Sequence, residues 1–135
     1  MNSNTGRNNF QTHRLGLYHA AFEFSKTEPN VEIDTNISKF GHIRIQKGGK
    51  EYRIMVKALS SGEPVPFNTD YDIINNFYFL VVCTGVYDNI ITLYKLPIKY
   101  VSERVSSNVD KDGKTNYWLD HPYYRSFKVS ALTIP

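Results

Sequence analysis

Two adjacent glycines, Gly48 and Gly49, constrain the fold of this chain more than any other feature of its sequence. Apolar and polar residues alternate on both sides of this pair, over residues 42–47 and 50–58. Alternation with a period of two is typical of a β-strand with one buried face. Gly-Gly readily takes the positive φ angles that a two-residue hairpin turn requires. The segment 40–59 is therefore predicted to be a β-hairpin.

A two-residue turn also fixes the register of the predicted hairpin. Counting back from the turn brings Arg44 opposite Arg53. The same count brings His42 opposite Met55. In this register the regularly spaced apolar residues fall on one face of the hairpin, which we expect to be buried. The other face is predicted to be open, and it carries His42, Arg44, Gln46, Glu51, Arg53, Met55 and Lys57.

The 135 residues are enough for one domain with its own hydrophobic core. Residues 1–12 are rich in Asn, Ser, Thr and Gly and are predicted to be a disordered tail, so that residues 13–135 form a single domain. An amphipathic helix is predicted from Thr12, as its N-cap, to about Lys26. Its apolar residues form two neighbouring rows that we expect to pack on a sheet, Leu15, Tyr18 and Phe22 in one and Leu17, Ala21 and Phe24 in the other.

The remaining elements are predicted from apolar runs and from the glycines and prolines that interrupt them. Strands are expected at residues 31–34, 77–84 and 90–96, the second of them buried on both faces, and a helix is expected to begin after Pro97. Residues 60–76 and 106–116 are expected to be loops. These elements predict an α/β (α+β) three-layer domain with a mixed sheet of about five strands flanked by helices.

The composition limits which binding partners and which cellular location we expect for this protein. The net charge of +3 permits a nucleic-acid partner without requiring one. The single cysteine, Cys83, lies in the apolar run FYFLVVCT and is expected to be a buried thiol. No apolar run approaches the roughly 20 residues that span a bilayer. We therefore expect a cytoplasmic protein with no membrane partner.

Five pieces of the chain, in this order, resemble the PD-(D/E)xK, or restriction-endonuclease-like, nuclease superfamily. They are the helix LGLYHAAFEFSK, the loop NISKFG, the hairpin GHIRIQKGGKEYRIMVKAL, the strand FYFLVV and the strand end YKLP, and they extend over roughly residues 13–105. The resemblance implies a three-layer nuclease fold. It also implies a site in which one acid on each hairpin strand holds Mg²⁺ and a lysine two residues after the second acid assists the attacking water.

Lys57 matches the lysine of this motif, whereas His42 and Met55 stand at the two positions of the acids. Mg²⁺ selects oxygen ligands, so an imidazole and a thioether do not replace carboxylates. The resemblance therefore implies a degenerate site that keeps the position of its lysine and has lost its metal ligands. No metal ligand and no cofactor are predicted on this interpretation.

Three functions remain open from the sequence. The first is a nucleic-acid-binding protein that acts as a non-catalytic subunit or regulator, with phosphate contacts from Arg44, Arg53, Lys47 and Lys50. The second is an active Mg²⁺-dependent DNA endonuclease whose acids have migrated around Lys57, with Asp34, Glu51 and Glu23 as candidates. The third is a protein-binding inhibitor or decoy that keeps only the nuclease fold. A homodimer is a further open possibility.

Overall fold

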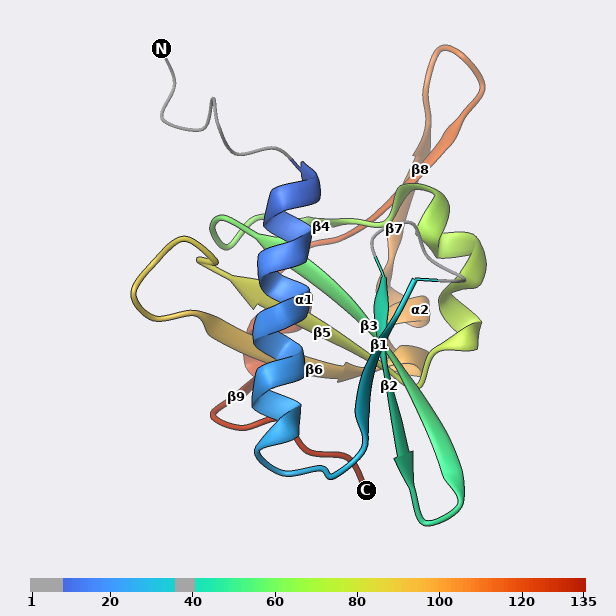
Figure 1. Cartoon of the computed structure of the whole chain (residues 1–135). Coiled ribbons are helices and arrows are strands. Elements are labelled where there is room, and N and C mark those ends of the chain that lie inside the picture. Colours follow the sequence, from blue (N-terminus) through green and yellow to red (C-terminus); the bar gives the residue numbers. More distant parts are fainter. Residues whose placement is uncertain (1–8, 36–40) are drawn as a thin grey trace.

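The computed structural model describes residues 9–35 and 41–135, with the backbone alone for Asn9 and for residues 68–70. Six strands form the main mixed sheet in the order β1-β2-β3-β5-β6-β9, and three form a smaller sheet in the order β4-β8-β7 (Figure 1). The helices of the described residues are α1 (Asn9–Ser25), α2 (Ile98–Arg104), α3 (His121–Tyr124) and the 3₁₀ helices η1 (Asn68–Asn76) and η2 (Arg125–Phe127). The mixed α+β class predicted from the sequence is thereby confirmed.

The predicted hairpin is formed by β2 (His42–Lys47) and β3 (Lys50–Leu59). Gly48 and Gly49 take φ angles of 60° and 76° in the turn between them. The pairing of Arg44 with Arg53 confirms the predicted register, which is maintained as far as the pair Ile43–Ile54. β1 (Val31–Asp34) then pairs with the outer edge of β2, so that Asp34 lies opposite His42.

β5 (Phe79–Thr84) lies in the middle of the main sheet, parallel to β3 on one side and antiparallel to β6 (Thr92–Pro97) on the other. All six residues of β5 are buried, which confirms the prediction of a central strand. β9 (Lys128–Val129) completes the sheet beside β6. The helix predicted after Pro97 is α2, with Pro97 at its N-cap.

α1 covers one face of the main sheet (Figure 1). A Cβ atom on Gly16 would come within 2.3 Å of the Cβ of Ala58, so glycine permits the close approach of α1 to β3. Leu17, Ala20 and Phe24 are buried in the same core. α1 begins at Asn9, so the predicted N-cap at Thr12 is wrong, and only residues 1–8 of the expected tail lie outside the described residues.

The second predicted row of α1 does not pack on the sheet. Leu15, Tyr18 and Phe22 are 37%, 55% and 60% exposed, whereas Leu17 is 5% exposed. The small residues Gly16 and Ala20 bring that side of the helix onto the sheet, and this turns the larger side chains outward. The expected broad buried stripe is therefore wrong for this row.

The opposite face of the main sheet packs on a second core, formed with η1, α2 and the smaller sheet. The smaller sheet contains β4 (Val65–Pro66), β7 (Ser106–Val109) and β8 (Thr115–Leu119), so the predictions of loops at 60–76 and 106–116 are wrong in part. The turn between β7 and β8 is stabilised by Asp110, whose Oδ1 accepts hydrogen bonds from the backbone N–H groups of Asp112 and Lys114. No described helix is both long and apolar enough to cross a membrane.

Candidate functional site

The hairpin face that the sequence predicts to be open divides into two halves with different environments. We name the residues farthest from the turn, His42, Met55 and Lys57, the base of this face. We name the residues nearer the turn, Arg44, Gln46, Glu51 and Arg53, its tip. The base residues are between 1% and 5% exposed, whereas each tip residue is at least partly exposed. The prediction of an open face is therefore wrong for the base and right for the tip.

His42 is enclosed at the base of the hairpin, with 1% of its surface exposed. Its ring lies edge-to-face with Phe77, with the ring centroids 5.1 Å apart. Neither ring nitrogen has a hydrogen-bond partner within the described part of the chain. Burial lowers the pKa of His42, and the positive charges of Arg53 and Arg44 lower it further, against the opposing effect of Asp34. The buried position of His42 therefore favours the neutral form of its imidazole.

Lys57 and Met55 are buried at 5% and 4% exposure, on the face of β3 that turns away from α1. The Lys57 Nζ lies 5.8 Å from the centroid of the Phe67 ring. Phe67 and Phe77 belong to segments that the sequence predicted to be a loop and the start of a strand, and both are buried over this face. These aromatic residues keep Lys57 out of contact with a polymer at the surface.

Arg44 lies among three carboxylates at the tip. It forms an ion pair with Glu32, and its Nη1 lies 3.2 Å from Asp34 Oδ2. Its Nε lies 3.8 Å from Glu51 Oε1. The hydrogen bond to Glu32 raises the pKa of Arg44. These carboxylates compensate the charge of Arg44 and leave little of it for a phosphate.

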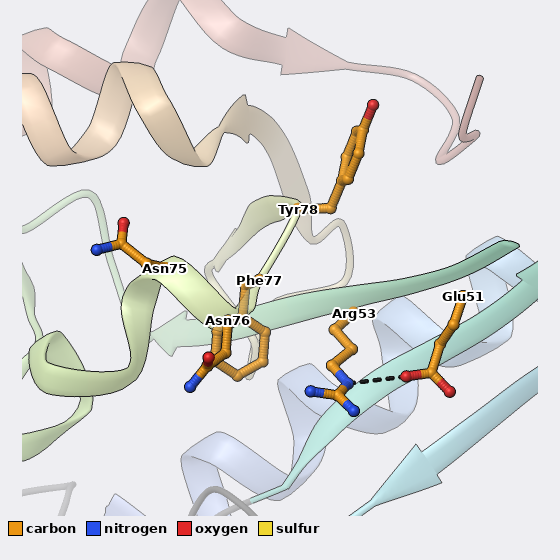
Figure 2. A pocket seen from close by; sticks show the side chains of 6 residues that line it. All are labelled: Glu51, Arg53, Asn75, Asn76, Phe77 and Tyr78. Carbon is orange, nitrogen blue, oxygen red and sulfur yellow. Dashed lines mark hydrogen bonds and ion pairs between the residues drawn. The ribbon is translucent and has the colours of Figure 1, made fainter.

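Arg53 has a more open position than Arg44. Its Nε donates a hydrogen bond of 2.9 Å to Glu51 Oε2, and 42% of its side chain is exposed. It lines a hollow of about 300 Å³ together with Glu51, Asn75, Asn76, Phe77 and Tyr78 (Figure 2). In Figure 2 the side chains of Asn76 and Phe77 point to the same side as the guanidinium of Arg53, and the ring of Tyr78 points away from it. Arg53 and Asn76 therefore offer hydrogen-bond donors to one open hollow.

The two lysines that flank the turn are engaged differently. Lys47 Nζ lies 3.1 Å from Glu28 Oε1 and donates to the backbone oxygen of Ile134, so it fastens the C-terminal segment. Lys50 is exposed, and its Nζ lies 4.6 Å from the centroid of the Tyr78 ring. Of the two, Lys50 is better placed to meet a ligand at the tip.

The donor atoms of this region do not fit Mg²⁺. Asp34 and Glu51 form ion pairs with arginines. Glu23 lies on α1, which packs on the opposite face of the sheet from Lys57, and its Oε2 lies 2.8 Å from the Nζ of Lys26. Within residues 9–35 and 41–135, no three His, Cys, Asp or Glu side chains are grouped as metal ligands. Positions 42 and 55 supply nitrogen and sulfur, which Mg²⁺ does not select. The described residues therefore give the migrated-acid hypothesis no support.

Sequence reasoning missed Asn76 and the aromatic cover of the base. Asn76 ends η1 just before the buried strand β5, where a polar segment enters the sheet. Polar loop residues positioned by a rigid strand frequently carry binding functions, and this was the available signal. No comparable signal showed that Phe67 covers Lys57, because Phe67 lies ten positions further along the chain, in a segment predicted to be a loop.

Comparisons with protein-family models, with curated proteins and with solved structures found no match. The resemblance to the PD-(D/E)xK superfamily accordingly stays a prediction from the sequence. We therefore base the function on the geometry and the charges of the hairpin.

Proposed function

We propose that this protein is a nucleic-acid-binding domain with a restriction-endonuclease-like fold, and that it acts as a non-catalytic subunit or regulator. The observation that carries this proposal is the exposed guanidinium of Arg53 in a hollow of about 300 Å³ beside Asn76. In this proposal the tip of the hairpin contacts the phosphate backbone, and the buried base keeps only a structural role.

Arg53 is well prepared for a phosphate. Glu51 holds its Nε and thereby orients the guanidinium. The two terminal nitrogens of the guanidinium remain available to donate two parallel hydrogen bonds to phosphate oxygens. Hydrogen bonds between charged groups are shorter and stronger than those between neutral groups. The amide of Asn76 supplies a neutral donor in the same hollow, and Lys50 adds a positive charge at the turn.

Fewer residues are available for phosphate contacts than the sequence led us to expect. Arg44 is compensated by three carboxylates, and Lys57 is buried. The contacts that remain are those of Arg53 and Lys50. Because each phosphate contact with duplex DNA contributes about −0.9 to the slope of log K against log salt concentration, two contacts give a slope of about −2.

A fluorescence-anisotropy titration tests the proposal, with a labelled duplex and a labelled single strand at several salt concentrations. Arg53→Gln should weaken binding to all sequences alike and should flatten the salt slope by about one, since phosphate contacts carry no base readout. Arg125→Gln is the matched control, because Arg125 is exposed and lies outside the hairpin. Its slope should equal that of the wild type.

Two results would overturn the proposal. One is an absence of binding to either probe at low salt. The other is binding by Arg53→Gln with the affinity and the slope of the wild type. In either case the protein-binding alternative would take first place.

A further inference from the structure

Residues 131–135 contact the rest of the chain in the way that a bound peptide contacts its receptor. They follow β9 and have no regular secondary structure. In Figure 1 this segment, which we name the strap, runs from β9 past the C-terminal end of α1 to the point marked C. Leu132 and Ile134 are 0% and 5% exposed, whereas the residues that alternate with them are exposed. An extended segment thus inserts every second side chain into the core between α1 and the main sheet.

Side chains from three parts of the fold hold the backbone of the strap. Thr27, just after α1, donates a hydrogen bond of 2.6 Å from its Oγ1 to the backbone oxygen of Leu132. The next carbonyl oxygen along the strap accepts a hydrogen bond of 2.6 Å from Lys95 Nζ, on β6. The one after it accepts a hydrogen bond of 3.2 Å from Lys47 Nζ, at the end of β2. Three consecutive carbonyl groups of the strap are therefore bound.

Glu28 adds a buried negative charge to this set. Its side chain is 2% exposed, and its Oε1 lies 3.1 Å from the Nζ of Lys47. Its Oε2 accepts a hydrogen bond of 3.2 Å from the backbone N–H of Ile134. A buried carboxylate is costly unless it is paired and hydrogen-bonded, so Glu28 depends on both the lysine and the strap. We name Thr27, Glu28, Lys47 and Lys95 the strap site.

This arrangement is the one by which proteins recognise extended peptides. Hydrogen bonds to the peptide backbone supply affinity, and pockets for alternate side chains supply specificity. We propose that the strap site is a peptide-binding site for an extended segment with apolar side chains two positions apart. In this proposal the strap is the intramolecular occupant of the site, and a segment of a partner protein with the same pattern displaces it.

The tether of the strap favours a partner protein over a second copy of this chain. Ser130 alone separates the strap from β9. A short tether of this kind holds a ligand at an effective concentration in the millimolar range. The strap of a second copy would make the same contacts without this advantage, so it would not displace the resident strap. A partner segment gains the advantage by adding contacts of its own outside the strap site.

The proposal does not depend on nucleic-acid binding. The strap packs on the face of the main sheet that α1 covers. The hollow beside Arg53 is lined by Phe77, which belongs to the core on the opposite face. The failure of one proposal therefore leaves the other in place.

Native-state hydrogen exchange of the wild type tests whether the strap leaves its site without global unfolding. The amide of Ile134 should exchange through a local opening that depends little on urea, because such an opening exposes little surface. The buried amides of β5 should exchange only through unfolding, with a strong dependence on urea. If the Ile134 amide matched the β5 amides in protection and in urea dependence, the strap would open only on unfolding, and the proposal would be overturned.

A peptide titration tests recognition in trans. Leu132→Asp combined with Ile134→Asp should release the strap of the full chain, because burying unpaired carboxylates is unfavourable. A fluorescent peptide of residues 130–135 should bind to this double variant, and at least about tenfold more weakly to the wild type, whose site is occupied. Circular dichroism checks that the double variant retains the fold. If it does not, the exchange measurement on the wild type decides.

Two altered peptides serve as matched controls. Thr133→Ala in the peptide should leave its affinity unchanged, because the Thr133 side chain is exposed and the contact uses its carbonyl group. Leu132→Ser combined with Ile134→Ser should weaken binding by at least about tenfold, because each apolar side chain contributes about 1.5–3 kcal/mol when it is fully buried.

Two results of these measurements would contradict the proposal. One is binding of the doubly substituted peptide as tightly as the peptide of the native sequence. The other concerns the occupant and comes from sedimentation velocity. If the wild type formed a dimer that the double variant does not form, a second copy would occupy the strap site, and a partner protein would be the wrong occupant.

Discussion

The base and the tip of the hairpin present the same alternating pattern to one side of the sheet, and they differ in what lies over them. At the base, Phe67 and Phe77 pack over the sheet, and Lys57 is 5% exposed. At the tip, Arg53 keeps 42% of its side chain exposed and forms an ion pair with Glu51.

The difference between base and tip shows that the alternation of apolar and polar residues assigns each residue to one face of the hairpin. It does not determine whether other segments cover that face. The tip extends beyond the second core, so its polar residues meet water and one another. The base lies under segments that are distant in sequence. The polar residues of the base were therefore misjudged, and those of the tip were not.

The largest expected effect concerns the apolar packing of the base. Met55→Ala should lower the free energy of unfolding by about 2–5 kcal/mol, because it removes buried contacts and leaves a cavity in the second core. Arg53→Ala, at the tip of the same strand, should change it by less than about 0.5 kcal/mol. Urea denaturation of both variants measures the contrast. Equal effects would show that base and tip do not differ in burial.

A smaller effect concerns the charge of His42. Because burial lowers the pKa of His42 below 6.5, the unfolded chain binds a proton more readily than the folded chain does. The stability that this group contributes is complete above pH 6.5 and is lost as the pH falls through the folded-state pKa. The midpoint of urea denaturation should therefore fall as the pH is lowered from neutral to mildly acidic values. His42→Leu should lose this part of the pH dependence, and an unchanged profile would contradict the assignment.

The local features of the hairpin were predictable from sequence because they depend on neighbouring residues. Gly48 and Gly49 set the turn, the turn set the register, and Pro97 marked the start of α2. The polar hairpin formed by β7 and β8 was missed, because strands with few apolar residues have a weak pattern. The turn at Asp110 depends on hydrogen bonds that composition does not reveal.

The candidate site was predictable only in part. The shared face of Arg44, Glu51 and Arg53 follows from the register and is confirmed. The compensation of Arg44 was not predicted, because it needs Glu32 and Asp34 from a third strand whose pairing the hairpin does not fix. The orientation of α1 was misjudged because side-chain size was given more weight than the close approach that Gly16 permits.

The smallest expected effect concerns the exposed ion pairs of the tip. Arg44→Gln removes the cation that lies among Glu32, Asp34 and Glu51 and leaves the three carboxylates to repel one another. At low salt this variant should show a slightly lower urea midpoint than the wild type. Salt screens exposed charges, with a Debye length of about 10 Å at 0.1 M and about 3 Å at 1 M. The difference between variant and wild type should therefore shrink as salt is added. Met55→Ala is the internal control, because the loss of buried apolar contacts is not screened and its effect should persist at high salt. If the deficit of Arg44→Gln also persisted in full at 1 M salt, the ion pairs of the tip would be as shielded from solvent as the base, and the contrast between the two halves of the hairpin would fail.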